Sequence, residues 1–68
     1  MEMKKYKVSY FKKGAGEVEY ITNYYVNKVL ALEKALKDLE VDMFDLDKPT
    51  KEQLKEKGIK DFKIEEAK

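Results

Sequence analysis

The residue types that most often perform covalent chemistry are missing from this chain. It contains no histidine and no cysteine, which are the commonest general base and the strongest nucleophile of enzymes. Ser9 falls between lysines, and no motif places a base beside Thr22 or Thr50. We therefore expect structural roles for these three hydroxyl groups and predict that the protein is not an enzyme.

The acidic run DMFDLDKPTKE is the best candidate for a metal site. Counting Asp45 as position one of a calcium loop places Glu56 at position twelve, where a bidentate carboxylate belongs. Pro49 and Thr50 then fill positions five and six, although position six needs glycine for its sharp turn. Because the pattern fails there, we predict no metal ion and no cofactor.

Lysines interleaved with aromatic residues near the N-terminus suggest a second chemistry, the binding of nucleic acid. Residues 1–13 carry a net charge of +4, whereas the whole chain carries +1. Lysines that follow phosphates beside aromatic rings that stack on bases are typical of sequence-tolerant single-strand binding. The alternative is that these lysines only keep an exposed strand soluble. The candidate nucleic-acid-binding residues are Lys4, Lys5, Lys7, Lys12 and Lys13.

Composition predicts one small folded domain in a reducing compartment. The 68 residues are 43% hydrophobic with eight aromatic side chains, five Tyr and three Phe, which is too rich for a disordered chain. The absence of cysteine is typical of cytoplasmic proteins. No apolar run approaches the roughly 18 residues that a membrane span needs, so we expect a cytoplasmic protein outside the membrane.

The N-terminal half predicts a β-hairpin. Residues 4–13 and 17–26 alternate like strands, and the sequence GAG between them indicates a turn. A three-residue loop places Tyr10 opposite Tyr20 and Tyr6 opposite Tyr24, whereas a two-residue loop places Tyr10 opposite Ile21. We choose the first register because it gathers most apolar residues on one face. That face holds Tyr6, Val8, Tyr10, Tyr20 and Tyr24.

The C-terminal half predicts two helices and a last strand. Asn27 is expected to cap a helix over residues 28–40, and Thr50 with Gln53 has the spacing of a capping box that starts a short helix. Gly58 suits the end of that helix, followed by contact between Ile59 and Leu54 and a strand over residues 60–66. In the loop between the helices, we expect Met43, Phe44 and Leu46 to fold back onto the core. The apolar stripe predicted for the first helix is Val29, Leu32, Ala35, Leu36 and Leu39.

These elements predict an α+β fold in the order β-β-α-(short α)-β. The sheet is expected to have three mainly antiparallel strands, with the first strand central and the long helix packed on one face. The segments KKYKVSYFKKGAGEVEYITNYYVNKVLALEKALKDLE and GIKDFKIEE resemble small uncharacterised Lys-rich proteins of Gram-positive bacteria and their phages. This resemblance is one of layout and composition, and it implies a phage or mobile-element origin without any functional motif.

Apolar residues on the second face of the hairpin lead to the main functional hypothesis. In the chosen register Phe11, Ile21 and Tyr25 form a diagonal patch, and Leu30 lies among the charges of the helix. Either the short helix covers this patch or another molecule does. We predict a non-enzymatic protein-interaction module that binds a partner or a second copy through Phe11, Ile21, Tyr25 and Leu30. The alternative is weak nucleic-acid binding through the N-terminal lysines.

Overall fold

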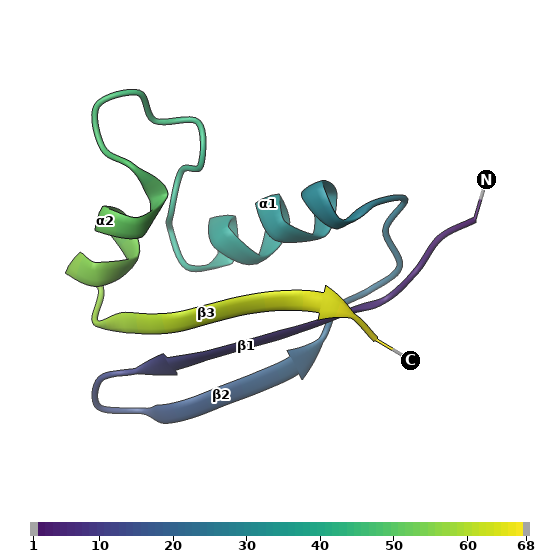
Figure 1. The fold of residues 1–68 in the computed structure, drawn as a ribbon, viewed down its shortest axis with the longest axis horizontal. Helices are drawn as coiled ribbons and strands as arrows, with labels where there is room; N and C mark the ends of the chain where they lie inside the picture. The colour runs from purple at the N-terminus through teal and green to yellow at the C-terminus, as the bar shows by residue number, and fades with distance from the viewer. Residues whose placement is uncertain (1, 68) are drawn as a thin grey trace.

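The computed structural model describes residues 2–67, which form one antiparallel sheet with both helices on the same side (Figure 1). The strand order is β2-β1-β3, so the first strand is central, as predicted. The predicted α+β fold is therefore confirmed. Neither helix within residues 2–67 has the length and apolar character needed to cross a membrane. The elements are β1 (Tyr6–Lys12), β2 (Gly16–Ile21), α1 (Lys28–Asp38), α2 (Thr50–Glu56) and β3 (Ile59–Glu66).

The hairpin has the predicted loop length but a different register. Its loop spans residues 13–15, and Val8 lies opposite Tyr20 instead of Thr22. The amide of Ala15 donates to the carbonyl of Lys12 at 3.0 Å, and Gly14, at the third position of this turn, has a φ of 89°. That position requires a positive φ in a type II turn, which explains why Gly14 belongs inside the loop. Because the partners shift by two residues, each side chain keeps its predicted face.

The second strand is shorter than predicted, since β2 ends at Ile21. Tyr24 was expected on the covered face but is 61% exposed, with the Lys5 ammonium 4.9 Å from its ring centroid. Tyr25 continues the hairpin only as a single bridge, in which its amide and carbonyl pair with those of Lys4. The strand ends early because the Oγ1 of Thr22 accepts from the Tyr6 amide at 3.0 Å and so replaces a backbone carbonyl.

Helix α1 begins as predicted but turns a different side to the sheet. The Oδ1 of Asn27 accepts from the amide of Leu30 at 3.0 Å, which confirms the N-cap. Val29 is 57% exposed, whereas Ala31 and Ala35 are buried. The predicted stripe is therefore wrong at its first turn. Two alanines against the sheet let the helix axis come close to β1, where Val8 is fully buried.

The end of α1 adopts a Schellman motif that the sequence did not reveal. The amide of Glu40 donates to the carbonyl of Lys37, and the amide of Val41 donates to that of Leu36, both at 2.9 Å. Val41 and Leu36 belong to the same buried cluster, which is the hydrophobic contact that accompanies this motif. The motif places Glu40 in the left-handed region, with a φ of 60°.

The main core lies where the two helices meet the start of β3. The buried cluster contains Leu36, Val41, Leu54 and Ile59. Beside it, the rings of Tyr10 and Phe62 stack across β1 and β3 with centroids 5.9 Å apart. A register shift opposite Tyr10 interrupts this strand pair, and Asp61 there has a φ of 55°. Aspartate tolerates this conformation better than most residues, so the bulge fits its sequence.

Gly58 connects the end of α2 to the hairpin turn. It has a φ of 74°, and its carbonyl accepts from the amide of Lys13 at 2.9 Å. A Cβ added at Gly58 would lie 3.0 Å from the Cβ of Lys13. The predicted helix end at this glycine and the burial of Ile59 beside Leu54 are both confirmed.

The first and last strands, β1 and β3, lie side by side, so residues near the two ends of the described chain meet (Figure 1). The amide of Ala67 donates to the carbonyl of Lys5 at 3.0 Å. The ammonium of Lys4 lies 3.4 Å from a carboxylate oxygen of Glu66. Residues near both ends of the described chain therefore extend the contact between β1 and β3.

We predict that Gly58→Ala destabilises the protein more than Gly14→Ala does. Both glycines have positive φ, but only a Cβ at position 58 meets another side chain. The left-handed conformation should cost about 1 to 2 kcal/mol in each variant, and the contact with Lys13 should add about 1 kcal/mol at Gly58. Urea unfolding of both variants measures the difference. Equal losses would show that the hairpin turn moves away from the added Cβ without a cost in stability.

We also predict that Glu40→Gly stabilises the protein by about 1 kcal/mol, because glycine adopts the left-handed conformation without steric cost. Glu33→Gly is the matched control, since the same replacement within the helix should destabilise by about 1 kcal/mol. Urea unfolding measures both changes. A stability loss in Glu40→Gly would mean that the Glu40 side chain stabilises the motif.

Candidate protein-binding surface

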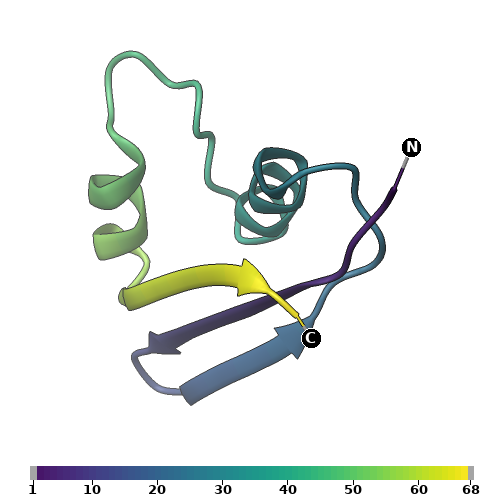
Figure 2. The same cartoon turned by 45° about the vertical axis from the view of Figure 1, so that its right-hand side comes forward.

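The α1–α2 loop, residues 39–49, carries the most exposed apolar side chains of the described structure. It stands away from the sheet above α2 (Figures 1 and 2). Leu46 is 99% exposed and Phe44 is 65% exposed. Of Met43, Phe44 and Leu46, only Met43 packs against the buried cluster. The expectation that all three residues fold back onto the core is therefore wrong for Phe44 and Leu46.

The backbone of this loop is held by its own aspartates. The Oδ1 of Asp42 accepts from the amide of Phe44 at 2.9 Å. The Oδ1 of Asp45 accepts from the amides of Asp47 and Lys48 at 2.8 and 3.2 Å. These bonds satisfy the backbone locally, which explains how a loop with few buried side chains keeps one conformation.

Gln53 of α2 clamps the two ends of the loop together. Its Oε1 accepts from the amide of Asp42 at 2.8 Å, and its Nε2 donates to the carbonyls of Asp42 and Lys48 at 2.7 and 2.8 Å. The predicted capping box is therefore wrong. Pro49 occupies the N-cap position, Thr50 is already helical, and no side chain caps the helix. The side-chain amide of Gln53 bonds the loop that precedes the helix instead of the backbone of the N-cap residue.

An ion pair closes the loop on its other side. The Nζ of Lys48 lies 2.7 Å from a carboxylate oxygen of Glu56, the last residue of α2. The hydrogen bond to Glu56 raises the pKa of Lys48. Lys48 is therefore paired first with Glu56, but its charge also acts on Asp45, so it offsets part of the negative charge around Leu46.

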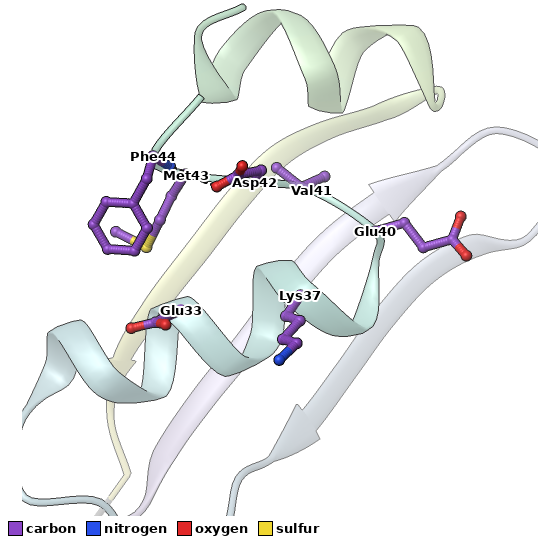
Figure 3. Close-up of a pocket in the computed structure, with 7 residues that line it drawn as sticks. All are labelled: Glu33, Lys37, Glu40, Val41, Asp42, Met43 and Phe44. Carbon is purple, nitrogen blue, oxygen red and sulfur yellow. Dashed lines mark hydrogen bonds between the residues drawn. The ribbon is translucent and has the colours of Figure 1, made fainter. Parts of the chain in front are cut away.

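A hollow of about 360 Å³ lies between the loop and α1 (Figure 3). Val41, Met43 and Phe44 supply its apolar lining, and Glu33 and Lys37 face it from the helix. The hollow is therefore partly apolar, and the exposed side chain of Leu46 follows two residues after Phe44 on the same loop. Such a combination is typical of surfaces that bind another macromolecule.

Negative charge surrounds these apolar groups. Residues 40–47 contain four acids and no basic residue, and each acid is exposed. Within residues 2–67, no group of three or more acidic side chains is arranged to hold a metal ion. The aspartates instead accept backbone hydrogen bonds, as described above. The four acids are Glu40, Asp42, Asp45 and Asp47.

The diagonal patch of Phe11, Ile21 and Tyr25 does not form. In the observed register Phe11 lies opposite Glu17, and Ile21 lies opposite Lys7. The pair of Ser9 and Glu19 separates them, since the register shift moved Ile21 along the sheet. Phe11 is 36% exposed and Ile21 is 52% exposed, so neither helix covers them.

The other two predicted contact residues lie on the helix side of the sheet. Tyr25 lines a groove beside α1, together with Tyr20 and Ala31. Burial and the neighbouring Tyr10 raise the pKa of Tyr20 in this region. Leu30 is 44% exposed on α1. Ile21 lines the same groove as Tyr25, whereas Phe11 and Leu30 lie elsewhere, so the structure brings only two of the four predicted residues together and their binding role stays a prediction.

The N-terminal lysines are dispersed in the same way. Lys7 lies 2.8 Å from Glu19, and this hydrogen bond raises the pKa of Lys7. Lys4 pairs with Glu66, while Lys12 and Lys13 lie at the far end of β1. Tyr6, one of the aromatic residues interleaved with these lysines, is 5% exposed. The candidate lysines and rings therefore form no continuous strip.

Comparison of the chain with family models, with curated proteins and with solved structures finds no match.

Sequence reasoning missed the loop because it counted Phe44 and Leu46 as core residues. The signal was present in the spacing of Asp42, Asp45 and Asp47, each one or two residues from an apolar side chain. Aspartate at that spacing favours side-chain bonds to the backbone two residues later, which keep a loop outside the core.

We predict that Gln53→Ala loosens the loop and destabilises the protein by about 1 to 2 kcal/mol, because three hydrogen bonds to the loop are lost. Gln53→Glu keeps an acceptor for the Asp42 amide but loses both donors, so its loss should be of similar size. Hydrogen exchange of the Asp42 and Phe44 amides measures the loosening. Unchanged exchange would show that the aspartates alone hold the loop.

Proposed function

We propose that this protein is a non-enzymatic protein-interaction module that binds its partner through Phe44 and Leu46 of the α1–α2 loop. The observation that supports this most is the 99% exposure of Leu46 on a loop whose backbone is held by Asp45 and Gln53. Leaving leucine in water forgoes about 1.5 to 3 kcal/mol of burial. For so small a domain, that loss is best explained by burial against a partner.

The order of the loop supports the same proposal. Binding usually costs free energy because flexible side chains and loops must be fixed. Here Gln53 and the aspartates already hold the backbone, so a partner has less to order. Exposed aromatic and aliphatic anchors on a rigid frame are the usual centre of a protein interface.

Charge defines the kind of partner. The acids around Leu46 would repel a second copy of the same loop, since residues 40–47 carry four negative charges and no positive one. They would attract a partner whose apolar cleft is bordered by lysine or arginine. We place this interaction in the cytoplasm, in keeping with a chain that has no cysteine.

Capture from a lysate of the source organism tests this proposal when it is done with matched variants. A true partner should be retained by the wild-type protein and by Val29→Ser, a change at an exposed residue of α1, and lost with Leu46→Ser and Phe44→Ser. Truncating such an anchor typically costs about 2 kcal/mol of binding, or roughly thirtyfold in affinity. Because both side chains are exposed, these variants should keep their stability within about 0.5 kcal/mol.

Two results would contradict the proposal. One is a set of retained proteins that is the same for all four baits. The other is the recovery of nucleic acid that is released by salt and by Lys12→Glu, which would favour the alternative function.

A further inference from the structure

The sheet face opposite the helices is open and carries charge in ordered rows, as the pairing register shows. Figure 2 shows that both helices lie on the other side of the sheet. The β2 edge of this open face presents Glu17 and Glu19, and the β3 edge presents Lys60 and Lys63. All four side chains are exposed.

Two rows of three side chains cross the open face from strand to strand, and each row has an acid at the β2 edge and a lysine at the β3 edge. Phe11 on the central strand lies between Glu17 and Lys60, and Ser9 lies between Glu19 and Lys63. The Lys60 ammonium lies 4.8 Å from the ring centroid of Phe11, which confirms that both side chains project to this face. At these two levels one edge is therefore acidic and the other basic, with a partly exposed ring between them, whereas at the level of Lys7 the β3 edge carries Glu65 and the β2 edge carries Ile21.

We propose that two copies of the chain pack with their open faces together, about a two-fold axis parallel to the strands. Such an axis places the β2 edge of each copy over the β3 edge of the other while each row keeps its level. Glu17 then faces Lys60 of the second copy, and Glu19 faces its Lys63. The two Phe11 rings meet near the axis.

The charges select this axis over the other face-to-face arrangement. A two-fold axis across the strands would place β2 over β2, so that Glu17 and Glu19 met the acids of the second copy. Like charges brought together in this way oppose association. In the proposed arrangement Lys7 approaches its own symmetry mate, but Glu19 lies 2.8 Å from it in the same copy and Glu65 is its partner in register.

The bulge in β3 argues against the other way of joining these edges. Extending the sheet sideways would pair β2 of one copy with β3 of the next and would give an open filament. At Asp61 the chain has a φ of 55° and the register shifts, so the β3 edge is irregular. Irregular edges resist the addition of a strand.

The size of the face makes this a weak dimer. Three strands spaced about 4.8 Å apart and about 20 Å long present on the order of 300 Å² per copy. Stable interfaces bury about 800 Å² per partner. Association should therefore be visible only at high protein concentration, and low salt should strengthen it.

Analytical ultracentrifugation at low salt, up to about 1 mM protein, tests the proposal. The wild-type mass should rise from 8.0 kDa toward twice that value and level off there. Glu19→Lys and Lys63→Glu should each raise the dissociation constant about tenfold, because each brings like charges together. The variant with both changes should return to within about threefold of wild type, since the attraction is restored with reversed signs.

Lys51→Glu is the matched control, because it makes the same charge change on α2, away from the open face. It should leave the dissociation constant unchanged, as should Leu46→Ser, which separates this result from the fate of the loop proposal. A chain that remains monomeric at about 1 mM overturns the proposal. Growth beyond the dimer, or a double variant as weak as the single ones, overturns it as well.

Discussion

One-sided burial of the central strand is the constraint on which this structure depends. Val8 of β1 and Ala31 of α1 are both fully buried, because the alanine side of the helix comes close to the sheet. Helix α1 contacts β1 and β3, and α2 contacts β3. Within residues 2–67 no third helix covers the other face. The core is correspondingly small, and each turn that positions a helix matters for stability.

The same constraint explains why apolar side chains remain in water on two separate surfaces. Phe11 and Ile21 lie on the uncovered face, and Leu46 lies on a loop that reaches beyond the core. The two surfaces differ in character. The open face consists mostly of charged side chains and holds little apolar area. The α1–α2 loop instead combines exposed apolar groups with a backbone held by hydrogen bonds. A small domain can thus carry two surfaces that do not compete for the same residues.

Local signals predicted much of the fold, because the deciding interactions are close in sequence. Asn27 caps its helix, Gly58 ends the second one, and the alternation along β1 places Val8 inside. Signals that depend on distant residues failed. The register followed the turn at Gly14. The capping box did not form, since Pro49 occupies the N-cap position and the side chain of Gln53 bonds the distant Asp42. The side chain of Leu46 could not be placed, since hydrophobicity alone does not distinguish a core residue from one displayed on a loop.

The hydrogen bond between Ala67 and Lys5 determines how the fold would respond to force. Because the first and last strands are antiparallel neighbours, tension between these residues acts on the end of their ladder. The inter-strand bonds run perpendicular to the strands, so they would open one after another instead of sharing the load. Stretched by its ends, the molecule would unzip from β3 inward, and it is mechanically soft in that direction.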